Sequence, residues 1–173
     1  EAAGDVNGDG YADVIVGAPD LTNGQADEGG VFVYYGTAAG LPLNPDWTMT
    51  ADQSGACFGI SVASAGDVNA DGYADVIVGA FLYDHTLSNE GAAFVYLGSP
   101  SGLASSPTWS GYGSRALAYF GRSVASAGDL NGDGYGDIIV VAYGSTRGQA
   151  DEGAALVYYG SRTGPSPSAD RKA

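Results

Sequence analysis

The sequence predicts an all-β protein made of β-propeller blades, each a sheet of four antiparallel strands, with an incomplete ring within one chain. Three observations predict this fold. A nine-residue acidic pattern recurs every 62 residues, beginning at Asp5, Asp67 and Asp129. Short apolar runs rich in β-branched and aromatic residues follow each copy, bounded by turn residues, as is typical of strands. No segment keeps a 3.6-residue period for three turns, so a helical repeat is not favoured.

Composition agrees with this fold class and limits the partners. Glycine accounts for 29 of the 173 residues, and glycine and β-branched residues both weaken a helix interior. The formal net charge of −14 argues against nucleic acid as a partner, because a phosphate-binding surface needs a basic patch. No apolar run is long enough to cross a bilayer, so membrane insertion is not expected. Cys57 is the only cysteine, which excludes an intrachain disulfide.

The second repeat shows the order of strands in one unit. A Phe-Gly segment beginning at Phe58 is the expected first strand, and the acidic loop turns into a second strand at residues 76–80. A Gly-rich connection leads to Glu90 and a third strand, and a Pro-containing turn leads to a fourth strand at Trp109. Four antiparallel strands at a fixed period make a propeller blade, with the more apolar strands towards the central axis.

The repeats divide the chain into one domain and a tail. We expect blade units at about residues 1–57, 58–119 and 120–164, and a flexible tail or linker at residues 165–173. The first unit lacks its Phe-Gly strand, and the last lacks a Trp strand. These units are too few for a ring of about four to eight blades. Other copies of the chain, or the rest of a larger propeller, are therefore expected partners.

The acidic loop places oxygen ligands at alternate positions, as a hard cation requires. Positions one, three, five and nine are Asp, Asn, Asp and Asp, and the tyrosine at position seven offers its backbone carbonyl. A glycine at position six permits the turn that aims this carbonyl inward. Carboxylates about 4 Å apart repel by roughly 4 kcal/mol per pair at an effective dielectric near 20. We therefore expect the loop to need a bound cation.

Calcium fits this ligand set better than magnesium or zinc. The oxygens suffice for about six or seven ligands, and no His or Cys lies nearby to attract zinc. The loop is not an EF-hand, because its ninth residue is Asp and a strand follows at once. Such clusters are also ordinary turn formers, and their repetition in register is what favours a metal site. Three bound calcium ions would raise the net charge from −14 to −8.

The combined motifs resemble the FG-GAP repeat of integrin α-subunit β-propellers and their bacterial relatives. Phe58-Gly59 and Phe120-Gly121 are similar to its first motif, and Gly17-Ala18-Pro19 to its last. The second and third units depart from the last motif, with Gly79-Ala80-Phe81 and Val141-Ala142-Tyr143 in its place. The resemblance covers nearly the whole chain apart from the tail.

This resemblance implies one structural calcium ion in the hairpin loop of each blade, three in all, with ligand binding on the opposite face. The implied metal ligands are side-chain oxygens and the backbone carbonyls of the tyrosines: Asp5, Asn7, Asp9, Tyr11 and Asp13; Asp67, Asn69, Asp71, Tyr73 and Asp75; and Asp129, Asn131, Asp133, Tyr135 and Asp137.

Other chemistry-bearing residues predict no second site. His85 stands alone and is expected at the surface. Glu28, Glu90 and Glu152 recur before glycine, which indicates a role in turn geometry. The tryptophans could stack on sugar rings, but their place in strands favours packing. No Ser-His-Asp set, phosphate-binding loop or zinc motif is present, so no enzymatic activity, catalytic residue or organic cofactor is expected.

Three functions remain open at this point. The first is a calcium-binding extracellular FG-GAP propeller module, secreted or at the cell surface, for adhesion or for binding a protein or glycan. The second is a structural protein whose open blade arrays assemble between chains into a ring or filament. The third is a non-catalytic domain of a larger secreted enzyme.

Overall fold

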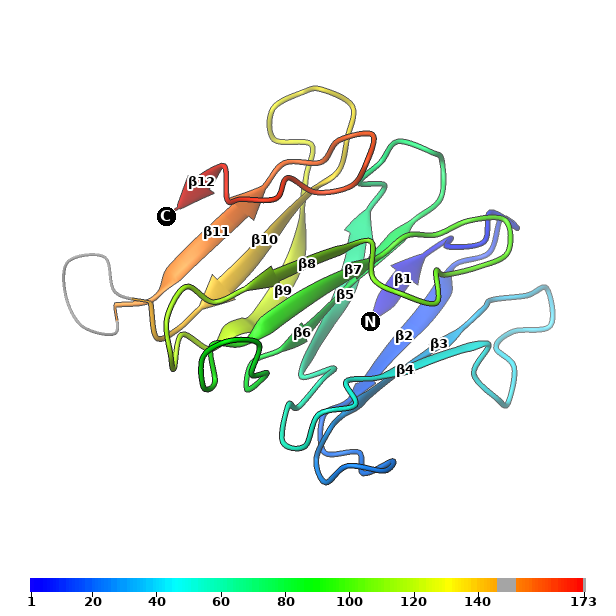
Figure 1. Cartoon of the computed structure of the whole chain (residues 1–173). Helices are drawn as coiled ribbons and strands as arrows, with labels where there is room; N and C mark the ends of the chain where they lie inside the picture. The colour runs from blue at the N-terminus through cyan, green and yellow to red at the C-terminus, as the bar shows by residue number, and fades with distance from the viewer. Residues whose placement is uncertain (146–151, 173) are drawn as a thin grey trace.

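The structure is a computed structural model that describes residues 1–145 and 152–172. These residues form twelve strands and no helix. The strands make three antiparallel sheets of four, each running in chain order from one edge to the other (Figure 1). The predicted all-β architecture of four-stranded blades in an open array is therefore confirmed.

Each sheet is one blade. Blade 1 contains β1 (Ala2–Gly4), β2 (Asp13–Ala18), β3 (Gly30–Tyr34) and β4 (Trp47–Thr50). Blade 2 contains β5 (Ser61–Gly66), β6 (Asp75–Ala80), β7 (Ala92–Tyr96) and β8 (Trp109–Tyr112). Blade 3 contains β9 (Phe120–Gly128), β10 (Asp137–Ala142), β11 (Ala154–Tyr158) and β12 (Arg171–Lys172).

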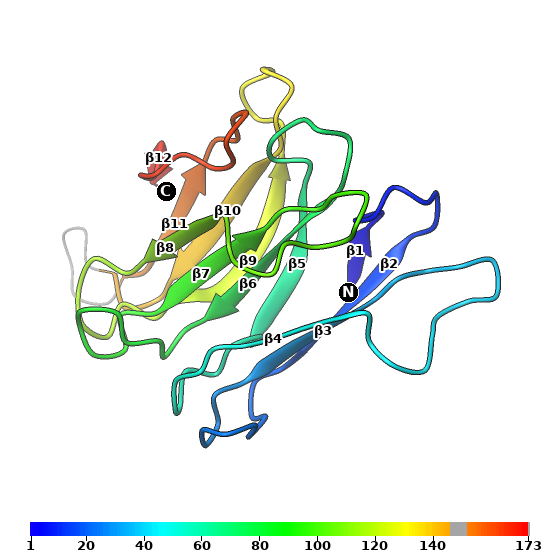
Figure 2. The same ribbon diagram turned by 45° about the vertical axis from the view of Figure 1, so that its right-hand side comes forward.

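The first strands line one side of the array. β5 contacts β1 on one side and β9 on the other, whereas β4 and β8 form the opposite edges of their sheets. Figure 2 shows the three sheets side by side in this arrangement. Equivalent strand pairs keep the same register one period apart, so that Ile15 faces Val33 and Ile77 faces Val95. The 62-residue period of the sequence is thus a period of the structure.

Adjacent blades pack face to face. The face of blade 1 that carries Ile15, Val33 and Trp47 meets the face of blade 2 that carries Val78 and Phe94. We call these the forward face of blade 1 and the rear face of blade 2. Because side chains alternate along a strand, each blade has one face of each kind.

The junction between blades 2 and 3 repeats this packing. The forward face of blade 2, with Ile77 and Trp109, packs against the rear face of blade 3, with Val140 and Tyr158. Every residue of β6 and β7 is consequently buried. The rear face of blade 1 has no such cover in this structure, and its Val16 is 43% exposed.

The Phe-Gly segments connect adjacent blades, in addition to leading into the first strand of their own blade. Phe58 forms a parallel bridge with Gly29 of the preceding blade, and β5 begins three residues later at Ser61. A Cβ added at Gly29 would lie 2.2 Å from the carbonyl oxygen of Phe58, so only glycine permits this approach. Phe120 repeats the bridge with Gly91. Both phenylalanines are 1% exposed.

The two ends differ from the sequence prediction. Blade 1 has a short first strand, β1, although its Phe-Gly segment is missing. The sequence predicts no fourth strand in the last unit, but Arg171 of β12 pairs with Val157 of β11. Just before β12, Asp170 accepts a hydrogen bond from the backbone N–H of Tyr159 at 2.8 Å.

The third blade therefore has a fourth strand that its sequence does not predict. Position 171 is the period equivalent of Trp47 and Trp109, but it is arginine. The strand lacks the apolar signature and is recognised by its backbone pairing. Residue 173 lies outside the described residues.

Candidate metal centres

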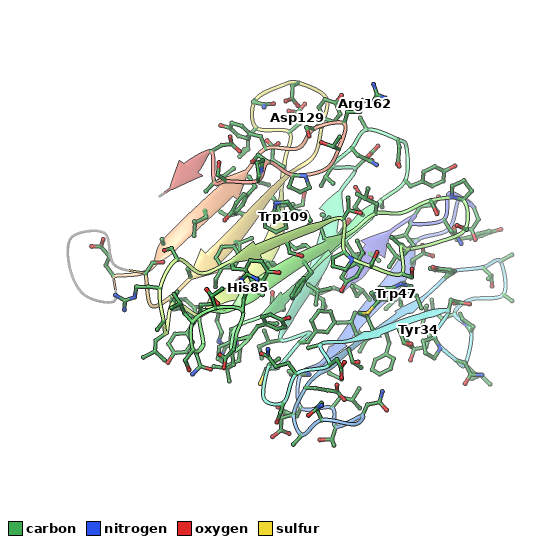
Figure 3. The ribbon with its side chains drawn as sticks, in the orientation of Figure 1. Tyr34, Trp47, His85, Trp109, Asp129 and Arg162 are labelled. Atoms are coloured by element: carbon green, nitrogen blue, oxygen red, sulfur yellow. The ribbon has the colours of Figure 1, made fainter. Side chains whose placement is uncertain are left out.

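The three acidic loops lie along one edge of the molecule. Each joins the first strand of a blade to the second, between β1 and β2, β5 and β6, and β9 and β10 (Figure 1). Asp129, which begins the third loop, marks this edge in Figure 3. We call this the loop edge. The hairpin places the first, third and fifth positions of each motif outside the strands and the ninth at the start of the second strand.

The first aspartate organises its loop. Asp5 Oδ1 accepts hydrogen bonds from the backbone N–H groups of Gly8 at 2.7 Å and Asp9 at 3.1 Å, and Oδ2 accepts one from Gly10 at 2.9 Å. Gly8 and Gly10 both have positive φ, at 74° and 89°. The side chain therefore sits in the concave side of a tight turn that glycine makes possible.

The third and fifth positions converge on the same turn. Asn7 Oδ1 accepts from the backbone N–H of Asp9 at 3.0 Å, and its Nδ2 donates to Asp9 Oδ2 at 3.1 Å. Asp9 Oδ1 in turn accepts from the backbone N–H of Tyr11 at 2.9 Å. Three predicted ligand side chains of the loop are thus held together by the loop's own backbone.

The third loop repeats this geometry and the second departs at one position. Asp129 accepts from Gly132 at 2.7 Å and Gly134 at 2.9 Å, as Asp5 does from its glycines. These backbone hydrogen bonds, Gly134 first, lower the pKa of the exposed Asp129 carboxyl. In the second loop the fourth position is Ala70, which still adopts a positive φ of 57°.

The ninth aspartate has a different environment. Asp13 is fully buried, and its two oxygens accept backbone hydrogen bonds from Val6 and Gly36, each at 2.8 Å. Burial raises the pKa of its carboxyl, the backbone bonds oppose this, and the carboxylates of Asp9 and Asp5 raise it further. This residue therefore ties the loop to the end of β3.

Asp75 is the corresponding residue of blade 2 and has the strongest shift. Burial raises its pKa to about 7 against hydrogen bonds from Gly98 and Val68, and the carboxylates of Asp71 and Asp67 add to the rise. The groups that shift this pKa include no basic side chain. A cation near the loop would relieve this unbalanced negative charge.

The loops offer oxygen donors that suit a hard cation. The donors are carboxylates, an amide oxygen and a backbone carbonyl, which suit calcium. In the described ranges, however, no three side chains of His, Cys, Asp or Glu converge as a metal site. Both oxygens of the ninth aspartate in the first loop, Asp13, already accept backbone hydrogen bonds, from Val6 and Gly36. A cation would use the remaining lone pairs of that carboxylate.

The recurring glutamates have a structural role in the connection between the second and third strands. Glu90 is 2% exposed, and its Oε1 accepts backbone hydrogen bonds from His85 at 2.9 Å, Leu87 at 2.8 Å and Thr86. Glu28 is equally buried and accepts from Asn23 at 2.7 Å. The buried carboxylate holds the connection between the second and third strands. This confirms turn geometry as its role in the first two blades, and the recurrence of Glu-Gly was its signal.

The remaining candidate residues pack as structural elements. The ring of His85 stacks on Tyr112, with centroids 4.0 Å apart. Trp47 Nε1 donates to the carbonyl of Ala104 at 3.1 Å, and Trp109 Nε1 to that of Ser166 at 2.9 Å. Figure 3 shows both tryptophans within the body of the sheets. Each indole thus joins one blade to the next, as its place in a strand predicts.

Comparison with known proteins agrees with this architecture. The chain matches the FG-GAP repeat family over residues 1–34, 58–96 and 120–158. Similar proteins include Integrin alpha-4 of Xenopus laevis, 34% identical over 82% of the chain, and Integrin alpha-6 of Homo sapiens, 35% identical over 79%. Integrin alpha pat-2 of Caenorhabditis briggsae is 37% identical over 83% of the chain.

The chain corresponds to only a part of these relatives. It spans 14%, 11% and 13% of their respective lengths. Among residues 1–145 and 152–172 there is no helix long and apolar enough to cross a membrane. Three matched repeats, each covering one acidic loop and the first three strands of one blade, show that the chain belongs to the FG-GAP repeat family.

Proposed function

We propose that this chain is a calcium-stabilised FG-GAP module of the integrin alpha type that works outside the cell or at its surface, in adhesion or in binding a protein or glycan. The observation that carries the calcium proposal is the repeated loop geometry. Asp5 and Asp129 accept the same backbone hydrogen bonds, at the same distances, 124 residues apart. Both loops therefore present the same oxygen donors in the same geometry, as a repeated cation site requires.

The charge balance supports a bound cation. Nine of the 20 acidic residues lie in the three loops. Burial first, and then repulsion from neighbouring carboxylates, raises the pKa of Asp13 and Asp75, and a divalent ion in each loop would reduce the repulsion. The ion would be structural in this proposal, because the loop edge fastens each first strand to its second strand.

Calcium removal is the direct test. A chelator is expected to lower the thermal midpoint, and excess calcium to restore it, because an ion that binds only the folded state stabilises it. The matched variant carries Asp9→Ala, Asp71→Ala and Asp133→Ala, one change per loop. Its midpoint should not respond to calcium, whereas exposed Asp20→Ala should respond as the parent does. A parent midpoint that ignores both chelator and calcium would show that the loops are only turns.

The adhesion proposal relies on the relatives, whose names identify them as integrin alpha chains. We place the ligand surface opposite the loop edge, at the connections between the second and third strands. Residues 81–91 form such a connection in blade 2, and Gln53 of blade 1 joins it through bonds of 2.7 and 2.8 Å with the backbone of Asp84. Immobilised chain would be screened against extracellular-matrix proteins and a glycan array. Calcium-dependent capture that is abolished by substitutions in the connections between the second and third strands would support the proposal. Capture that is lost only on substitution of the acidic loops would contradict this placement of the ligand surface.

A second candidate is assembly with further blades, either of a longer chain or of a second copy. The observation that favours it is the rear face of blade 1. Val16 is 43% exposed there, while its period equivalent Val78 is fully buried under blade 1. Light scattering would detect self-assembly as a mass above that of the 17.3 kDa chain. A monomer at all accessible concentrations would exclude the second copy.

A further inference from the structure

We infer that the three acidic loops act as one coupled series, in which a cation bound at one loop strengthens binding at the loop of the adjacent blade. The inference deepens the proposed function and rests on it, because it assumes that the loops bind calcium. It follows from a series of hydrogen bonds that connects each loop to the loop of the adjacent blade.

The junction between blades 1 and 2 contains a continuous path. Asp13 Oδ2 accepts from the backbone N–H of Val6 at 2.8 Å, and the carbonyl of Val6 accepts from the N–H of Ser99 in blade 2 at 3.0 Å. The residue before Ser99 is Gly98, whose N–H donates to Asp75 Oδ1 at 2.8 Å. Two buried ligand aspartates are thus joined through three backbone residues.

The junction between blades 2 and 3 repeats the path. Asp75 Oδ2 accepts from Val68 at 2.7 Å, and the carbonyl of Val68 accepts from Ser161 at 3.1 Å. Gly160 then donates to Asp137 Oδ1 at 2.9 Å. The carboxylate of Asp75 therefore takes part in both junctions, one oxygen towards each neighbour.

A second connection runs in parallel with the first. The carbonyl of Asp5 accepts from the N–H of Ala74 at 2.9 Å, and that of Asp67 accepts from Gly136 at 2.7 Å. The ring of Tyr73 also lies against loop 1, since a Cβ added at Gly8 would be 2.5 Å from Tyr73 Cε1. The first two loops thus each begin with an aspartate whose carboxylate shapes its own loop and whose carbonyl holds the next loop.

The path has little freedom to absorb a displacement. A Cβ added at Gly98 would lie 2.7 Å from the carbonyl oxygen of Val6 and 2.4 Å from that of Ala74. At Gly160 the equivalent distance to the carbonyl of Val68 is 2.8 Å. Gly98 and Gly160 are positioning residues, because their bare backbones let the two loops touch.

The physical basis of coupling is shared ordering. A cation that fixes the first and ninth aspartates of one loop also fixes the backbone groups that hold the neighbouring loop. The second cation then meets a loop that has lost part of its conformational freedom, so its binding costs less entropy. Because blade 2 borders both other blades, its loop should influence two sites directly, whereas each outer loop should influence one site directly and the far loop only through loop 2.

The test measures calcium binding at each loop separately. The amide resonances of Gly10, Gly72 and Gly134 report the three loops in a calcium titration of the whole chain followed by NMR. With Asp71→Ala, which removes an exposed ligand of loop 2 outside the path, the calcium Kd of loops 1 and 3 should rise at least about fivefold. With Asp9→Ala, the Kd of loop 2 should rise similarly, while that of loop 3 rises less.

The outcomes separate the inference from the proposed function. Parent loops that bind calcium, with outer-loop Kd values unchanged within about twofold in Asp71→Ala, would overturn the coupling alone. If calcium shifts none of the three glycine resonances in the parent, the proposed function fails and the inference with it. Amides of β6 and β7 verify the fold of each variant, and the milder Asp71→Asn serves if Asp71→Ala unfolds.

Discussion

At the scale of residues, the fourth position of the acidic loop differs between repeats without changing its conformation. Ala70 has a φ of 57°, and its equivalents Gly8 and Gly132 have 74° and 75°. A left-handed backbone strains alanine but not glycine. The second loop therefore carries a local cost that the other two avoid.

Exchanging these residues should move stability in opposite directions. Ala70→Gly is expected to raise the free energy of unfolding by roughly 1 kcal/mol, and Gly132→Ala to lower it by about the same amount. A Cβ at Gly132 meets nothing within 4 Å, so its effect isolates the backbone strain. Gly8→Ala should cost more, because it meets the Tyr73 ring. Urea unfolding in the presence of chelator measures all three, and equal effects at Gly8 and Gly132 would contradict the contact with Tyr73.

The buried glutamate of blade 2 predicts a pH-dependent effect. Burial alone would raise the pKa of Glu90, but hydrogen bonds from Leu87, Thr86 and His85, with the nearby His85 charge, bring it below its ordinary value of 4.5. A carboxyl whose pKa is lower in the folded state stabilises the fold above its unfolded pKa, and this contribution is lost as the pH falls through the folded pKa.

Glu90→Gln is therefore expected to lower the free energy of unfolding by roughly 1 kcal/mol at pH 7. The difference from the parent should shrink as the pH falls below the ordinary value of 4.5, and it should disappear once the pH lies below the lowered pKa of the folded state. Thermal unfolding between pH 3 and 7 provides the comparison, with exposed Asp20→Asn as the control. A difference that stays constant across this range would mean that the charge of Glu90 does not matter.

Residue types could be predicted from the sequence, but their burial could not. Alternating oxygens identified Asp5, Asn7 and Asp9 as a group, and these side chains do share one turn. The burial of Asp13 and its bonds to Val6 and Gly36 were not foreseeable, because they depend on where the end of β3 comes to lie. A local pattern does not specify the backbone donors supplied by a distant segment.

At the scale of elements, the strands that were easy to predict are those with a repeated apolar run. β2, β6 and β10 occupy the runs that follow the three acidic loops. The fourth strand of blade 3 was missed because arginine stands where the other blades have tryptophan. Its position is fixed by tertiary contacts instead, including the hydrogen bond from Trp109 to Ser166.

Removing residues 165–173 should expose the indole of Trp109. The truncated chain loses the carbonyl of Ser166 and the β12 pairing, so we expect a red shift of tryptophan emission and a lower thermal midpoint. Trp47 bonds to Ala104 instead, and a Trp47→Phe background removes its signal. Unchanged emission after truncation would show that this segment does not cover Trp109.

At the scale of the whole molecule, position in the array decides the cost of a mutation. Phe94 is 8% exposed between blades 1 and 2, while its equivalent Phe32 is half-buried on the uncovered rear face of blade 1. Phe94→Ala should lower the free energy of unfolding by about 3–5 kcal/mol, and Phe32→Ala by roughly 1 kcal/mol. Chemical denaturation of the monomer distinguishes them, and similar losses would indicate that the rear face of blade 1 is covered in solution.

The complete burial of β6 and β7 has a consequence for the order in which the molecule opens. Blades contact only their neighbours, so the stability of each depends on how many neighbours it has. Each outer blade can unfold by breaking one interface, whereas the middle blade can unfold only after an outer blade has detached or by breaking two interfaces. Backbone amides of β6 and β7 should therefore exchange with deuterium last, and protection should fall towards both ends of the chain. Duplicating the middle 62 residues would lengthen this protected centre while leaving every blade boundary of the same kind.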